Sequence, residues 1–173
     1  FKIDKKREVT DRYQGRSEIK IDNEEVFGLS ATATLYRRKA LEIIAGQAKA
    51  NHFQYFDEDF FAYKEDIDLA WRLRLFAWEN WLVTTTKAYH HRSVSKGKDL
   101  KESRKTRGFA NKLSYRNHLM LLYKNSFYKN LFKDFLAIKW YEFKKFVYLL
   151  LFERSTLVGV KEYFANIPSL AKK

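Results

Sequence analysis

Three clusters of carboxylates are the residues whose types and spacing suggest chemistry. They are Asp57-Glu58-Asp59, Glu65-Asp66 and Asp68, and they lie among aromatic residues between Tyr55 and Trp78. A carboxylate that aromatic neighbours shield from water can accept a proton from a substrate hydroxyl group. The same pattern also has a purely structural interpretation, because acidic residues in the first turn of a helix interact favourably with the helix macrodipole and stabilise the helix. Neighbouring carboxylates raise the pKa of such a group and a helix N-terminus lowers it, so the sequence leaves the basicity of Asp66 open.

The residues after these clusters predict the helix that would position them. From Glu65 the apolar residues recur at helical spacing. The apolar face of this helix consists of Leu69, Leu73, Phe76 and Ala77. Asp68 and Arg72 are four residues apart, which is the spacing of an ion pair on one helix face. Asp66 is therefore predicted to lie where a loop meets a helix, and the acids of 57–59 are interpreted as loop residues without a chemical role.

Two adjacent histidines, His90 and His91, end a predicted strand that begins near Asn80. Successive side chains of a strand point to opposite faces, so only one of the pair can face a given site. Such a histidine is more often structural than functional. A single imidazole can nevertheless complete an oxygen-rich site for Mn²⁺ or Mg²⁺ whose carboxylates come from elsewhere. Because the chain has no cysteine and no paired-histidine spacing, a self-contained zinc site is not expected.

The remaining elements follow from composition. Residues 1–23 are charged and predict an exposed loop, whereas 26–38 are rich in β-branched and aromatic residues and predict a strand. Gly28 in that strand indicates a close approach of another backbone. The segment 37–45 predicts a helix that ends at Gly46. Residues 92–108 are polar and predict a loop, and the chain beyond Phe109 has an almost wholly helical composition.

Length and charge limit the class of protein. The 173 residues suggest one domain or slightly more, and 34 Lys and Arg against 21 Asp and Glu give a formal net charge of +13. An anionic partner is therefore expected. No apolar run approaches the roughly 18–20 residues that span a bilayer, which predicts a soluble or membrane-surface protein. The first residue is Phe1 rather than methionine, so the chain is interpreted as a piece of a longer one.

The segment 109–173 interleaves lysines with aromatic residues, and this pattern has two interpretations. Its helices can pack on the rest of the domain, or they can lie on a membrane with aromatics at the acyl boundary and lysines on anionic headgroups. Nucleic-acid binding uses the same residue types, but the sequence has no RNP-like segment, zinc finger or KH-type GxxG. The aliphatic run Phe146–Phe152 favours lipid, so we expect an anionic membrane surface and no nucleic acid as partner.

Four segments follow one another in a recognisable order within residues 22–125. They read EVFGLSATATLYRRKALE, FDEDFFAYKEDIDLAWRLRLFAW, AYHHRSVSKG and YRNHLMLLYKN. Together they resemble the C-terminal half of a bacterial family 2 glycosyltransferase, of the rhamnosyltransferase-like group that builds cell-envelope polysaccharides. The resemblance implies an α/β fold, a partial GT-A fold over residues 1–108 with a mixed sheet and flanking helices. A basic amphipathic helical tail over 109–173 would follow it.

The resemblance also implies an activity and a set of residues. Enzymes of this family transfer a sugar from a nucleotide-sugar donor with inversion and use a divalent metal, Mg²⁺ or Mn²⁺. Asp66 matches the family's general base toward the acceptor hydroxyl, and Glu65 is its partner in the motif. His90 matches a metal or diphosphate contact. Residues that match substrate-binding positions are Gly28, Ser30, Arg37, Asp68 and Arg72.

The chain departs from the family pattern in three places. Ala31 replaces a glycine, residues 83–88 lack the usual proline, and the nucleotide-binding half with its DxD metal motif is not in this sequence. The acids of 57–59 lie too close to the acceptor loop to replace that motif. We therefore expect this chain to be the acceptor-side half of the enzyme and to be inactive without the nucleotide-binding half. That other half would supply most of the ligands of the metal ion.

The resemblance predicts a place of action as well. The acceptor would be a glycan or a lipid-diphosphate-linked sugar at the inner face of the cell membrane. From the residues alone, a different class stays open: a non-catalytic membrane- or polyanion-binding module.

Overall fold

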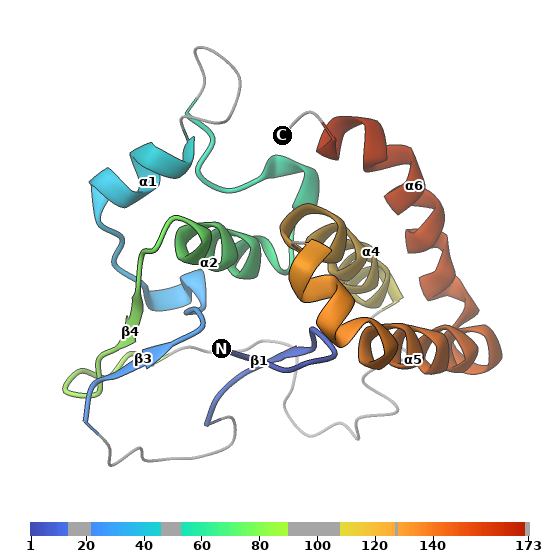
Figure 1. Ribbon diagram of the computed structural model, residues 1–173, viewed down its shortest axis with the longest axis horizontal. Coiled ribbons are helices and arrows are strands. Elements are labelled where there is room, and N and C mark those ends of the chain that lie inside the picture. The colour runs from blue at the N-terminus through green and yellow to red at the C-terminus, as the bar shows by residue number, and fades with distance from the viewer. Residues whose placement is uncertain (14–21, 46–52, 90–107, 127, 172–173) are drawn as a thin grey trace. The chain divides into compact units, whose positions relative to one another are not determined.

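The computed structural model describes residues 1–13, 22–45, 53–89, 108–126 and 128–171 (Figure 1). These residues form a mixed α/β fold, which confirms the predicted class. They divide into two compact units. The first contains the described residues of Phe1–Phe61 and Glu65–Tyr89, and the second contains Ala62–Lys64 and the described residues from Gly108 onward. The finer GT-A arrangement stays a prediction.

Two small antiparallel sheets lie in the first unit. Strand β1 (Lys2–Ile3) pairs with β2 (Val9–Thr10), and β3 (Glu24–Val26) pairs with β4 (Asn80–Leu82). The hairpin of β1 and β2 falls where the sequence predicts only a loop. Strand β4 confirms the strand predicted to begin near Asn80, although it ends at Leu82.

The strand predicted over 26–38 is wrong beyond Val26. The chain leaves the sheet there and forms a 3₁₀ turn at Ala31–Ala33. Thr34 keeps extended dihedral angles, yet no backbone hydrogen bond joins Thr34–Tyr36 to another described residue. The composition of this segment favours a strand, but a strand also needs a neighbour to pair with, and the described residues provide none.

The described part of the first unit has two α-helices, as the sequence predicts. They are α1 (Arg38–Ala45) and α2 (Glu65–Leu75), and they share a core of buried apolar side chains. This core consists of Ala40, Ile44, Leu69 and Leu73, with Tyr36, Leu41 and Trp78 packed around it. Phe76 and Ala77, predicted on the same helix face, lie beyond the end of α2 and are exposed. The helix stops because Ala77 has a positive φ of 60°, which a helix does not accommodate.

The described part of the second unit consists mostly of three helices. They are α4 (Gly108–Asn125), α5 (Tyr128–Phe152) and α6 (Val158–Leu170), with a 3₁₀ turn at Arg154–Leu157 before α6. Helices α4 and α6 approach closely at Gly159, where a β-carbon would come within 2.6 Å of the Lys112 carbonyl oxygen. Lys112 Nζ also forms a 2.6 Å ion pair with Glu162 of α6. The helical prediction beyond Phe109 is confirmed for the described residues.

The chain between η2 (Glu58–Phe60) and α2 has an unusual backbone. Phe61, Tyr63 and Lys64 have φ angles of 60°, 70° and 70°, and none of them is glycine. The β-carbon of a non-glycine residue disfavours this left-handed region, at a cost on the order of 1–3 kcal/mol for each residue. Such a conformation persists only where other contacts hold it.

Candidate active site

Asp66 is the second residue of α2, and its side chain is partly buried. Its Oδ1 accepts a 2.8 Å hydrogen bond from the Ile67 amide, and the Ala31 amide also donates to it. Burial raises the pKa of Asp66, while the hydrogen bonds from Ala31 and Ile67 act in the opposite direction. The sequence leaves the sign of this shift open. Burial, rather than the neighbouring carboxylates, decides it, and the result is a stronger base than an exposed aspartate.

Glu65 precedes Asp66 and shares its surroundings. Its Oε2 atom is buried and has no hydrogen-bond partner among the described residues. Burial raises the pKa of Glu65, and the charge of Asp66 raises it further. Two adjacent carboxyl groups with raised pKa values at the start of one helix are suited to holding or moving a proton.

Asp68 and Arg72 form the ion pair that the sequence predicts. The Asp68 side chain is fully buried, and its Oδ2 lies 2.8 Å from Arg72 Nε. Arg72 also donates from a terminal nitrogen to the Tyr55 carbonyl oxygen at 2.7 Å. The pair therefore ties α2 to the loop before η2. The predicted contact of these two residues with substrate stays a prediction.

Gly28 lies against α2, as its place in the sequence predicts. A β-carbon built on Gly28 would collide with the β-carbon of Ala70, so only glycine allows this approach. Ser30 follows in the same segment and is exposed. Its Oγ lies 3.0 Å from Thr32 Oγ1, and its carbonyl oxygen accepts a 2.7 Å hydrogen bond from Thr34 Oγ1. These bonds shape the loop whose Ala31 amide contacts Asp66.

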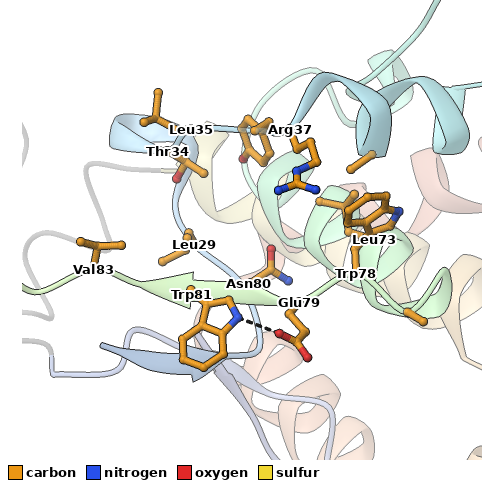
Figure 2. Close-up of a pocket in the computed structure, with 13 residues that line it drawn as sticks. Leu29, Thr34, Leu35, Arg37, Leu73, Trp78, Glu79, Asn80, Trp81 and Val83 are labelled. Atoms are coloured by element: carbon orange, nitrogen blue, oxygen red, sulfur yellow. Dashed lines mark hydrogen bonds between the residues drawn. The ribbon is translucent and has the colours of Figure 1, made fainter. Parts of the chain in front are cut away.

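Arg37 lines a groove of about 490 Å³ in the first unit (Figure 2). Thr34, Leu35 and Val83 lie at one end of this groove and Arg37 with Trp78 at the other. The Arg37 guanidinium carbon lies 5.9 Å from the centre of the Trp78 ring. Trp81 Nε1 donates a 2.8 Å hydrogen bond to Glu79 on another wall of the groove. The groove thus offers aromatic surfaces together with a cation.

Tyr36 connects this groove with Asp66. Its side chain lines the groove, and burial raises its pKa, with the charge of Asp66 contributing next. Asp66 itself is not among the described residues that line the groove. A ligand in the groove would therefore contact Tyr36 rather than the Asp66 carboxylate.

The predicted metal contact, His90, lies outside the described residues. Within the described part of the chain, no three histidine, aspartate or glutamate side chains lie close enough together to hold a metal ion.

The YRN segment of α4 forms a buried polar cluster in the second unit. Asn117 is fully buried, and its side-chain nitrogen donates to the carbonyl oxygens of Ala62 and Tyr63 at 2.8 and 2.6 Å. Arg116 Nε donates to Asn117 Oδ1 at 2.9 Å. These bonds hold the left-handed segment that directly precedes α2 in the chain.

His118 follows Asn117 and pairs with α5. Its Nε2 lies 2.6 Å from Glu142 Oε1, and burial lowers the pKa of His118. Burial is the largest influence on Glu142 and acts upward, but His118, Lys145 and Lys139 together lower its pKa. Burial and the Glu142 carboxylate also raise the pKa of Tyr115 to about 12. With both pKa values lowered, His118 is neutral and Glu142 is ionised near neutral pH, in the interior of the second unit.

Comparison with protein-family models, curated proteins and solved structures finds no match to this chain.

The aromatic groove and the role of Asn117 were not predicted from the sequence. A signal for the groove exists, because two of the four tryptophans, Trp78 and Trp81, lie three residues apart beside Asn80. For Asn117 the sequence offers only a weak signal, a polar residue between the apolar residues Leu113 and Leu121 of a predicted helix. Its partners are 54 and 55 residues away in the chain, and local periodicity does not reveal contacts at that distance.

Proposed function

We propose that this chain is the acceptor-side half of an inverting glycosyltransferase, with Asp66 as its catalytic base. The donor would be a nucleotide sugar, and the acceptor a glycan or a lipid-diphosphate-linked sugar of the cell envelope. The observation that supports this most is the environment of Asp66: a carboxylate with a raised pKa, oriented by two backbone amides at the start of a helix.

The chemistry asked of Asp66 is a single proton transfer. As the acceptor hydroxyl oxygen forms a bond to the anomeric carbon of the donor sugar, the bond from that carbon to the nucleoside diphosphate breaks. The hydroxyl proton passes to the Asp66 carboxylate and is later released to water. A base whose pKa is closer to neutrality accepts that proton more effectively than an ordinary aspartate. Attack from the side opposite the leaving group inverts the anomeric centre.

Arg37 and the groove beside it are the substrate contacts that this proposal adds to Asp66. A guanidinium group binds phosphate oxygens in a bidentate manner, and aromatic rings such as Trp78 offer apolar faces to sugar C–H groups. Within the described residues Arg37 has no ion pair, which leaves its charge available to a diphosphate. Tyr36 would separate that diphosphate from the base.

We assign the nucleotide-binding residues and most ligands of the divalent metal to a part of the enzyme other than the described residues. The metal would neutralise charge on the departing diphosphate. The roles proposed for Asp66, Arg37 and Tyr36 involve no metal ligand among the described residues.

Helix α5 supports the proposed location at the inner face of the membrane. One side of this helix exposes large apolar side chains, including Phe132 and Leu136 at 83% and 81% exposure, whereas Ile138 and Leu149 are buried on the other side. The exposed apolar residues on this side are Phe132, Phe135, Leu136, Trp140, Phe143, Phe146, Leu150 and Leu151. Exposed lysines at 133, 139 and 144 lie among them. Among the described helices, none is both long and apolar enough to cross a bilayer.

The proposal is tested by replacing Asp66 with asparagine in the full-length polypeptide that contains this chain. The asparagine side chain would keep the shape of the aspartate but could not accept the proton. We expect transfer to fall by about 10²-fold or more, the range of general-base catalysis, with donor binding retained. Glu58→Gln is the matched control, because Glu58 is an exposed carboxylate in the preceding turn that has no assigned role. Near-normal turnover of D66N would reject the assignment.

The same α5 surface also favours a second candidate, a non-catalytic membrane- or polyanion-binding module. Vesicle and RNA binding measured at two salt concentrations distinguish the two candidates. RNA binding that weakens steeply with salt, together with an absence of sugar transfer, would favour the module.

A further inference from the structure

The buried side-chain amide of Asn117 makes three hydrogen bonds to described residues, two of them to backbone outside α4. Its NH₂ group has two donors, and both are used on consecutive carbonyl oxygens, those of Ala62 and Tyr63. Its oxygen accepts from Arg116. An amide bound in this way fixes the orientation of two successive peptide planes, which an apolar residue in the same place would not do.

The backbone that Asn117 holds is the strap Ala62–Lys64. Tyr63 and Lys64 have the left-handed φ of 70° that non-glycine residues avoid. The strap is part of the second unit, and the next residue in the chain is Glu65, the first of α2. Because Lys64 is joined directly to Glu65, the backbone conformation of the strap bears on the first turn of α2, which contains Asp66.

We propose that Asn117 is a positioning residue for the base: it stabilises the left-handed strap and, through the peptide bond from Lys64 to Glu65, the first turn of α2, where Asp66 lies. This inference rests on the proposed function for its catalytic part. Arg116 supports it by fixing the Asn117 amide through Oδ1, so that both N–H groups face the strap.

The first test is hydrogen exchange in the variant Asn117→Ala. Without the two donors the strap relaxes, and we expect faster exchange of the backbone amides in the first two turns of α2. Asn111→Ala is the matched control, since Asn111 lies on the same helix and donates to Glu153 at 3.4 Å instead of to the strap. Unchanged exchange of the α2 amides in N117A would overturn the proposal.

The second test is kinetic. A misplacement of about 1 Å at a catalytic group lowers the rate on the order of 10²-fold, so kcat of N117A should fall by about that factor. The KM for the donor should change little, because Asn117 is not assigned to donor binding. A general loss of stability would lower the folded fraction, and with it the apparent kcat, at an unchanged KM. The kcat is therefore calculated per folded molecule, with the folded fraction measured by circular dichroism, and is compared with that of the N111A control. If the α2 amides of N117A exchange faster but its kcat is unchanged, Asn117 has only a structural role and the proposed positioning role is wrong.

The third test relieves the backbone strain directly. Glycine adopts a φ of 70° without strain, so Lys64→Gly in the N117A background should restore part of kcat and of the exchange protection. Lys64→Ala removes the same side chain but keeps the strain, and it should restore neither. Equal effects of glycine and alanine would contradict the strap mechanism. Should N117A fail to fold, Asn117→Ser, which keeps one donor, is compared in the same assays and should show intermediate exchange and kcat.

The exchange and kinetic results separate the two proposals. Altered exchange in a protein that transfers no sugar would reject the proposed glycosyltransferase and, with it, the catalytic part of this inference. Unaltered exchange in a protein that does transfer sugar would reject the role of Asn117 alone.

Discussion

At the level of single residues, the carboxylates of α2 differ in what surrounds them. Asp68 is fully buried but pairs with Arg72, so its charge is compensated. Glu65 and Asp66 are only partly buried, yet burial raises the pKa of both, because backbone amides rather than a cation offset their loss of solvent. An uncompensated carboxylate near solvent is suited to proton transfer, whereas a compensated one in the interior is suited to holding the helix.

A prediction about Asp68 follows from this difference. Asp68→Asn should lower the free energy of unfolding by about 3–5 kcal/mol, because it leaves the largely buried Arg72 guanidinium without its counter-charge. Urea denaturation followed by circular dichroism measures the loss. The double variant Asp68→Leu with Arg72→Met, which removes both charges, should be more stable than D68N. A D68N loss below about 1 kcal/mol would contradict this account of the pair.

At the level of elements, the sequence predicts helices better than it predicts strands here. The helix starting at Glu65 and the pair Asp68–Arg72 follow from spacings of three and four residues, which are local. The strand expected over 26–38 depends on a pairing partner, and composition does not supply one. Gly28 was nevertheless predictable as a close approach, because a glycine among β-branched and aromatic residues leaves room for a neighbouring backbone where a side chain would not.

A prediction about packing belongs to this scale. Gly28→Ala should destabilise the first unit by about 1–3 kcal/mol, since the added methyl group overlaps the Ala70 side chain. Thermal unfolding measures the change. Ala70→Gly in the same protein removes the overlapping methyl group and should recover much of the loss relative to G28A alone. An unchanged melting temperature for G28A would show that the loop at Gly28 does not pack on α2.

At the level of the whole molecule, charge and apolar surface lie together on α5. The net charge of +13 predicted an anionic partner, and the exposed aromatic side has lysines within it. Lys139 Nζ lies 5.6 Å from the Phe135 ring centre and Lys144 Nζ 5.7 Å from that of Trp140. The predicted boundary between residues 108 and 109, like the membrane partner itself, stays a prediction.

The vesicle experiment tests this surface. Replacing Lys133, Lys139 and Lys144 with glutamine should weaken binding to vesicles that contain phosphatidylserine by about 1 kcal/mol for each lysine near the surface. Phe132→Ser with Leu136→Ser should weaken binding at high salt as well, where the electrostatic attraction is screened. Substituting the exposed Lys39 of α1 is the matched control. Equal binding of all variants would contradict a membrane role for α5.

The candidate site was predictable only where it is local in sequence. Asp66 could be placed at a loop–helix junction from the residues that follow it. The direction of its pKa shift could not, because it depends on burial and on contacts such as that of the Ala31 amide, which is far away in the chain. The same is true of the hydrogen bonds from Asn117 to the strap and of the groove between α1, α2 and β4. Both bring together residues that are far apart in the sequence, so a local pattern does not predict them.

The pH dependence of kcat/KM in the full-length polypeptide tests the central claim most directly, since it reports the ionisation of the base in the free enzyme. A raised pKa means that Asp66 holds its proton to a higher pH than an ordinary aspartate and is inactive as a base below that pH. We predict a rate that falls with decreasing pH, with a midpoint above the usual aspartate pKa of about 3.9, and D66N should lack both the activity and this acid limb. A profile that stays flat as the pH falls through the carboxylate range, or an acid limb that persists in an active D66N enzyme, would contradict the role of Asp66.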